Sequence, residues 1–175
     1  LTAARLIAPS SELAIEERFY PSTALEDICG VAEEQVNKDR LYRALDHLLP
    51  HKAALEAHLK SRIGTLFEEP FDILLYDLTS TYFEGLGASN PQARRGYSRD
   101  HRPDCVQVVI GLVVTRSGLP LGYEVFAGNQ AESPTLEDMM AKMETLYGKA
   151  SRIWVFERGV ASERNLEALR KAGGL

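Results

Sequence analysis

Two stretches far apart in the chain, DILLYDLTSTYFEG at residues 72–85 and RIWVFERGVASERN at residues 152–165, share one pattern. Each contains a short apolar run, ILLY or IWVF, and each run is followed at once by an acid, Asp77 or Glu157. A buried strand would continue at lower cost with a hydrophobic residue, because an ionised carboxylate is costly to remove from water. A single acid after a strand is more often a solvated turn residue or a helix cap. The repetition of the pattern favours a functional pair over that simpler interpretation without deciding between them.

The sequence between these stretches predicts two more strands and a helix. CVQVVIGLVVT at residues 105–115 and LPLGYEVFAG at residues 119–128 are joined by a short turn, which is typical of an antiparallel hairpin. Ser133 and Pro134 open a helix. Its apolar face is formed by Leu136, Met139, Met140, Met143 and Leu146.

We therefore predict an α/β fold with three antiparallel strands, a crossover helix and a fourth strand parallel to the first. In this topology the first and fourth strands are neighbours. We expect Asp77 and Glu157, each near the end of its strand, to lie side by side.

The first seventy residues predict an all-helical region. Thr23 and Glu26 match a capping box, and Gly30 stands where a helix over 24–29 would end. Two further stripes of apolar residues predict a helix that stops at Pro50 and another over 51–67. We expect a helical module for DNA binding or dimerisation at residues 1–69 and a second domain at 70–175.

Composition sets the broad class. Apolar residues make up 45% and charged residues 26% of the chain, which is typical of a globular protein. The net charge of −5 argues against a uniformly basic coat for nucleic acid, although local clusters decide phosphate binding. No apolar run approaches about eighteen residues, so we expect no membrane span. The two cysteines lack CxxC spacing, which favours a reducing, cytoplasmic setting.

Two adjacent carboxylates repel each other, so they persist at one site only if they are protonated or bridged by a cation. Oxygen ligands without His or Cys suit Mg²⁺ or Mn²⁺. Two such ions about 4 Å apart hold the attacking and leaving oxygens of a phosphodiester displacement.

Three segments carry a resemblance to a known family. YDLTSTYFEG, the long stretch from RRGYSRDHRPDCVQVVIGL to GNQAESPTL, and IWVFERGVASERNLEALRKAGG resemble the catalytic core of DDE transposases from bacterial insertion sequences. The resemblance covers about residues 70–174. It implies an incomplete ribonuclease H-like core, Mg²⁺-dependent DNA cleavage and strand transfer, and Asp77 and Glu157 as the first two catalytic, metal-binding acids. It also implies transposon ends and target DNA as partners, a homodimer or a mixed dimer with full-length transposase, and a place at the bacterial nucleoid.

Two departures from the family pattern affect activity. The family has Asp where this chain has Glu157, and the extra methylene moves the carboxylate by roughly 1.5 Å, whereas catalytic groups tolerate about half an ångström. The family's third acid, a later Glu, is expected beyond the last residue here. We therefore predict an N-terminal transposase fragment that does not catalyse transposition alone. The alternatives are a catalytically dead DNA-binding or regulatory fragment and a decayed gene product.

A polar loop, ARRGYSRDHR, is the candidate DNA-binding segment. It is expected to grip phosphates beside the acids and to offer an aromatic ring for stacking on a base. The other interpretation is a solvated loop whose charges are offset by Asp100 and Asp104. The candidate DNA-binding residues are Arg94, Arg95, Tyr97, Arg99, His101 and Arg102.

Other features give weaker signals. TALEDICGV followed by NKDRLYRAL resembles a helix-turn-helix, with Arg40, Tyr42 and Arg43 as base-contacting candidates. A plain packing or dimerisation module explains that stretch at least as well. Gly128 is expected to permit a tight turn. Glu132 is placed near the site, but we assign it no catalytic role.

Overall fold

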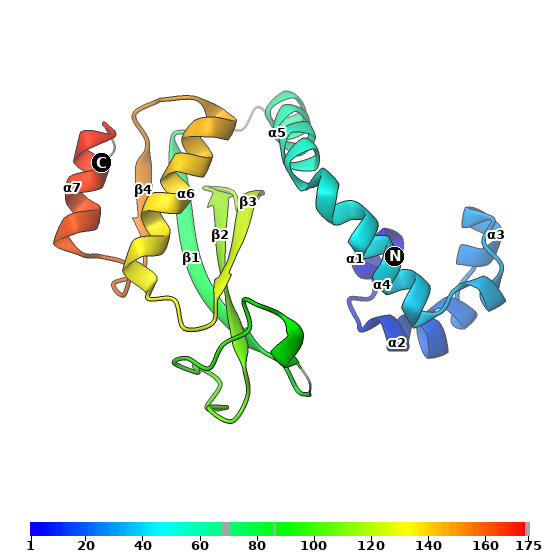
Figure 1. The fold of residues 1–175 in the computed structure, drawn as a ribbon. Helices are drawn as coiled ribbons and strands as arrows, with labels where there is room; N and C mark the ends of the chain where they lie inside the picture. Colours follow the sequence, from blue (N-terminus) through cyan, green and yellow to red (C-terminus); the bar gives the residue numbers. More distant parts are fainter. Residues whose placement is uncertain (68–70, 86, 174–175) are drawn as a thin grey trace. The chain divides into compact units, whose positions relative to one another are not determined.

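The computed structural model describes residues 1–67, 71–85 and 87–173. The chain forms two units, Leu1–Leu55 and Glu56–Leu175, and helix α5 (Lys52–Phe67) runs from one into the other (Figure 1). The predicted domain boundary at residues 69 and 70 lies outside the described residues and stays a prediction.

The first unit is helical, as the sequence predicts. The short helix α3 (Leu25–Cys29) ends at Gly30, which adopts the left-handed conformation with φ 62°. Ala24 is the residue before the first helical turn, and the Thr23 hydroxyl accepts from Leu25 N at 3.4 Å, so the predicted capping box does not form as expected. The other elements of this unit are α1 (Thr2–Ile7), α2 (Glu12–Ala14), η1 (Ile15–Phe19), η2 (Tyr20–Ser22), η3 (Glu33–Gln35), α4 (Lys38–Leu48) and η4 (Leu49–His51).

The helix predicted to stop at Pro50 is α4, but most of its leucine stripe is solvent-exposed. Leu41 is 7% exposed, whereas Leu45 and Leu48 are 41% and 48% exposed. The small core of this unit collects Ala4, Ile15, Tyr20, Leu25 and Leu41.

The second unit contains a four-stranded sheet in the order β3-β2-β1-β4. β1 pairs antiparallel with β2 and parallel with β4, and β2 pairs antiparallel with β3. This arrangement confirms the predicted fold class, including the crossover between the hairpin and the fourth strand. The elements are β1 (Ile73–Tyr82), η5 (Gly87–Ser89), β2 (Gln107–Thr115), β3 (Pro120–Ala127), α6 (Glu132–Tyr147), β4 (Ile153–Phe156) and α7 (Glu163–Lys171).

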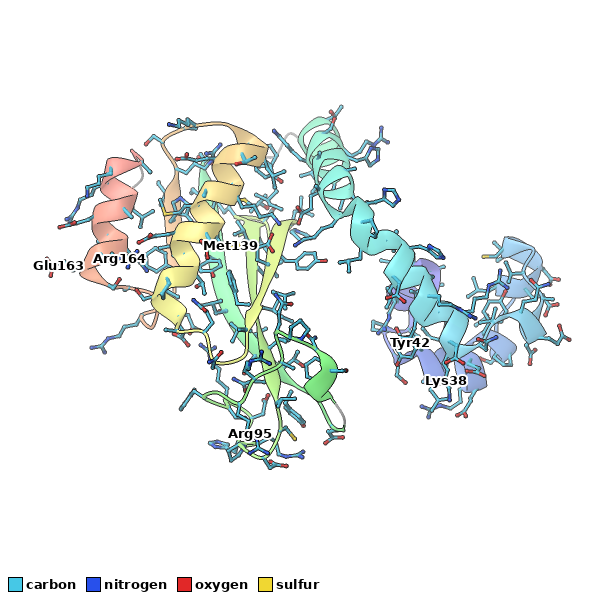
Figure 2. The ribbon with its side chains drawn as sticks, viewed as in Figure 1. Lys38, Tyr42, Arg95, Met139, Glu163 and Arg164 are labelled. Carbon is cyan, nitrogen blue, oxygen red and sulfur yellow. The ribbon has the colours of Figure 1, made fainter. Side chains whose placement is uncertain are left out.

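Successive side chains along a strand point to opposite faces of the sheet, so each face carries every second residue. On one face, Leu74, Tyr76 and Leu78 of β1 are buried against α6. Met139 points from α6 toward the sheet and is fully buried (Figure 2). Tyr76 donates from its hydroxyl to Thr135 Oγ1 of α6 at 2.8 Å, which anchors the helix over the strand.

The opposite face carries exposed apolar side chains in the second unit. Leu112 of β2 is the register partner of Asp77 and is 39% exposed. Ile153 and Val155 of β4 are 44% and 48% exposed. Asp77 therefore lies on the open face of the sheet, where its carboxylate remains in water.

Among the described residues, no helix is both long enough and apolar enough to cross a membrane.

Candidate functional site

The two acids that follow the matching apolar runs come together through the parallel pairing of β1 with β4. Tyr76 is the register partner of Phe156, so Asp77 and Glu157 occupy the next position on neighbouring backbones. Adjacent strands lie about 4.8 Å apart, and residues at matching positions point to the same face. Both acids are exposed. The structure thus brings the predicted pair to one place.

The sequence predicted that Asp77 lies near the end of its strand, but in the structure it lies in the middle of β1. β1 continues to Tyr82 because it stays paired with β2 through Gln107. β4 ends at Phe156, so Asp77 stands where one neighbouring strand ends and the other continues. This step in the sheet leaves room beside β1 for groups from other segments.

Arg99, from the loop between β1 and β2, occupies that place. Its Nη1 donates to the carbonyl oxygen of Leu78 at 2.8 Å, and its Nη2 donates to Oε1 of Glu132 at 2.7 Å. The hydrogen bond to Glu132 raises the pKa of Arg99, and the charges of Glu157 and Asp77 raise it further. The guanidinium therefore forms an ion pair with Glu132 and also feels the charges of Glu157 and Asp77.

Glu132, the first residue of α6, is a functional candidate for which no role was predicted from the sequence. A Cβ placed on Gly159 would stand 2.0 Å from Glu132 Oε2, so this carboxylate lies directly against the backbone after β4. Glycine at position 159 is what permits the approach. The sequence signal was weak, because only the folded course of the chain brings the start of α6 to the segment that follows Glu157.

The donor chemistry at this place suits a hard divalent cation, since carboxylate oxygens are the preferred ligands of Mg²⁺ and Mn²⁺. Over the parts of the chain that the structure describes, however, no three or more His, Cys, Asp or Glu side chains are placed to hold a metal ion. A positive group, Arg99, already stands beside the carboxylates. The side chains in this arrangement do not form a complete metal site.

Buried Gln107 anchors the loop that carries Arg99. Its side-chain amide donates to the carbonyl oxygens of Tyr97 and Gly128, each at 2.9 Å. Its backbone pairs with that of Arg94 in both directions, at 2.9 and 3.0 Å. The two ends of the loop segment 94–97 are thus fixed to the start of β2.

Two glycines make this anchoring possible. A Cβ on Gly128 would lie 1.9 Å from the carbonyl oxygen of Gln107, and one on Gly96 would lie 2.0 Å from that of Gly128. Backbone approaches this close exclude any side chain. Gly128 is needed for contact between chain segments, and its φ is not in the left-handed range, so the expected role in a tight turn is not what requires a glycine here.

A cavity of about 330 Å³ opens between this loop and the start of α6. Arg99, Glu132, Gln107 and Tyr97 are among its lining residues. Ser80 of β1 also lines it, and its buried hydroxyl has no hydrogen-bond partner among the described residues. Along β1 the cavity reaches from Ser80 to Leu78, the residue that follows Asp77.

The predicted DNA-binding residues of the loop divide into engaged and outward-facing groups. Arg102 bonds Glu84 at 3.0 Å and Asp104 through two nitrogens at 3.0 Å. These bonds from Arg102 lower the pKa of Asp104 to about 2. Arg94 donates to Ala93 O at 2.9 Å. One interpretation of the sequence was that acids offset the charges of this loop. The structure shows such an offset for Arg102, through Glu84 and Asp104, and for Arg99, through Glu132.

The remaining three loop candidates are exposed. Tyr97 is 84% exposed, and His101 adopts a left-handed backbone conformation with φ 56°. Arg95 is also exposed and lies on the loop beyond the ends of the strands (Figure 2).

In the first unit, the helix-turn-helix candidates lie on α4. Arg40 donates from Nη1 to the backbone and side-chain oxygens of Gln35, whereas Tyr42 is 51% exposed. α3, which would be the first helix of the motif, has only five residues. The geometry gives this interpretation no added support.

No family model matches the sequence, and no curated protein matches it. The chain is similar to the solved structure of a Mos1 transposase paired-end complex with left transposon end, with a TM-score of 0.42 and 8% identity over 91% of this chain and 55% of the other. It is also similar to a pre-cleavage Mos1 transpososome, with a TM-score of 0.41 and 11% identity over 99% of this chain and 56% of the other. The chain spans a little over half the length of these two proteins.

Proposed function

We propose that this chain is part of a DDE-type transposase and that it binds DNA at the loop and acid pair of its second unit. The observation that carries the proposal is the parallel pairing of Tyr76 with Phe156, the residues that directly precede Asp77 and Glu157. The sequence resemblance assigns the catalytic acids to the same two positions. The exposed side chains of Arg95, Tyr97 and His101 supply charge and an aromatic surface on the loop that carries Arg99.

The proposed partners are transposon-end and target DNA, and the proposed cofactor is Mg²⁺ or Mn²⁺, as two ions in an intact relative. When bound, such ions stabilise the attacking and leaving oxygens of a phosphodiester displacement. In this chain the acids would hold the ions, and the loop would hold the DNA backbone in register.

We further propose that these 175 residues bind DNA without cutting it. Glu157 is one methylene longer than the Asp of the family pattern, and Arg99 offsets the negative charge that would attract a cation. Both features weaken a metal site without removing the DNA-binding surface.

The test combines binding and cleavage on labelled duplex DNA with Mg²⁺ and Mn²⁺. Binding without strand cleavage is the expected result. Cleavage that Asp77→Asn abolishes would overturn the proposed inactivity and support the acid pair. A chain that unfolds cooperatively but binds no DNA would contradict the DNA-binding function itself.

A second candidate is a regulatory fragment that joins a full-length transposase in a mixed dimer. It is favoured by β4, an edge strand whose Ile153 and Val155 are exposed, because exposed edge strands pair readily with other chains. Light scattering after gel filtration tests self-association. Val155→Lys is expected to leave a monomer if the edge is the interface, and an unchanged dimer would place the interface elsewhere.

A further inference from the structure

The acid pair beside the end of β4 has its own positive group. Arg99 is tied to Glu132 at 2.7 Å and to Leu78 O at 2.8 Å, one residue from Asp77. Glu132 in turn lies against the backbone at Gly159, two residues after Glu157. Segments from β1 and α6 therefore meet at this one guanidinium, and the chain after β4 meets the Glu132 carboxylate that the guanidinium binds.

We propose that Arg99 is the internal counter-charge of the three carboxylates Asp77, Glu132 and Glu157, and that a divalent cation binds there only when Arg99 is displaced. A cation at this place would meet repulsion from Arg99 and would compete with it for Glu132.

Arg99 differs from the other arginines of the same loop in the groups that it contacts. Arg102 has its own partners, Glu84 and Asp104, and neither is part of the acid pair. Arg95 is exposed on the loop beyond the ends of the strands. Arg99 is thus the residue whose charge the proposed site uses.

A structural role alone would give a different result. If Arg99 only caps the Leu78 carbonyl, its removal lowers stability and leaves cation affinity unchanged. If it is the counter-charge, its removal raises cation affinity, because repulsion disappears and Glu132 is released.

The test measures Mn²⁺ binding by electron paramagnetic resonance, without DNA, on the full chain. Arg99→Gln is expected to bind Mn²⁺ about tenfold more tightly than the wild type. Arg99→Lys keeps the charge and is expected to stay near the wild-type affinity. Arg95→Gln, with the same charge change in the same loop, is the matched control and is expected to have no comparable effect.

Equal Mn²⁺ affinity in the wild type and Arg99→Gln would overturn the proposal, as would an equal gain in Arg95→Gln. If Arg99→Gln does not fold, the wild type still decides. Its thermal unfolding midpoint is expected to be the same in EDTA and in millimolar MgCl₂, and a clear rise with magnesium would contradict an internal counter-charge.

The inference rests on the acid pair of the proposed function but not on DNA binding. Loss of DNA binding with the expected Mn²⁺ result would refute the proposed function and leave the role of Arg99 standing. Intact DNA binding with unchanged Mn²⁺ affinity would refute only the role of Arg99.

Discussion

Tyr76 of β1 and Phe156 of β4 are register partners on neighbouring parallel strands, and each is followed by an acid. Their side chains lie among the groups packed on the covered face of the sheet, so the next residues, Asp77 and Glu157, face the open side. Packing of one aromatic pair therefore directs the carboxylate pair. Burial of Tyr76 and Phe156 therefore places the next residues, the two exposed acids, on neighbouring backbones.

Outward-facing and engaged arginines of the loop should differ in DNA binding. Arg95→Gln is expected to weaken binding and to lower the slope of log affinity against log salt by about 0.9, which corresponds to one lost phosphate contact. Arg102→Gln removes the same charge, but that guanidinium is held by Glu84 and Asp104, so its effect should be smaller. Fluorescence anisotropy over a KCl series measures both slopes, and equal slopes would contradict the division.

The close backbone contact at Gly128 predicts a severe effect of one methyl group. Gly128→Ala would place a Cβ 1.9 Å from Gln107 O, and the strands must separate to relieve it. The free energy of unfolding should fall by about 3 kcal/mol. Urea unfolding followed by Trp154 fluorescence measures it.

Gly64→Ala is the control for that substitution. Gly64 lies inside α5, and its Cβ would meet Phe71 at 3.8 Å, an ordinary contact. Alanine should stabilise the helix there by up to about 1 kcal/mol. Similar losses at both glycines would argue against the backbone contact as the cause.

Lys142 of α6 holds a buried carboxylate. Its Nζ donates at 2.8 Å to Glu56, Glu124 and Tyr123 O, and Glu56 is 8% exposed. Lys142→Met leaves the Glu56 charge without its lysine partner and should lower the free energy of unfolding by about 3 kcal/mol. Adding Glu56→Leu should recover much of that loss. A double variant as unstable as the single one would show that packing, not the unpaired charge, sets the cost.

Alkaline pH should destabilise the second unit through Tyr76. Burial raises the pKa of Tyr76 to about 12 from an ordinary value of 10.0. The unfolded chain therefore loses this proton first, and the free energy of unfolding should fall as pH rises from about 10 to about 12. Tyr76→Phe should flatten that fall in urea titrations at each pH, and an unchanged slope would contradict the assignment.

The sheet was predictable from the sequence because its signals are local. Apolar runs, the short turn at Arg116–Gly118 and the Pro134 helix start each depend on a few adjacent residues. They predicted β1, the β2–β3 hairpin, α6 and β4 with boundaries within a few residues of the structure. The convergence of Asp77 and Glu157 followed from that topology.

Residues placed by the fold of the loop were not predictable in this way. Gln107 sits at an alternating strand position and gives no sign that its amide joins Tyr97 to Gly128. Glu132 and Gly159 contact each other only because α6 starts beside the end of β4. In α4 the helical periodicity of the leucines correctly predicted a helix. It did not predict that most of these leucines are exposed.

The most direct test of the shared site is a cysteine cross-link between its two acidic positions. In a chain with Cys29 and Cys105 replaced by serine, Asp77→Cys with Glu157→Cys should form a disulfide rapidly on mild oxidation, because neighbouring strands lie about 4.8 Å apart and disulfides span Cα separations of about 4.4 to 6.8 Å. Asp77→Cys with Ile153→Cys is the control, since Ile153 pairs with Ile73 and lies roughly 13 Å along the strands from that position. A cross-link at 77 and 157 but not at 77 and 153, read by mass spectrometry, is the expected result. No cross-link at 77 and 157, or equal yields for the two pairs, would contradict a shared acidic site.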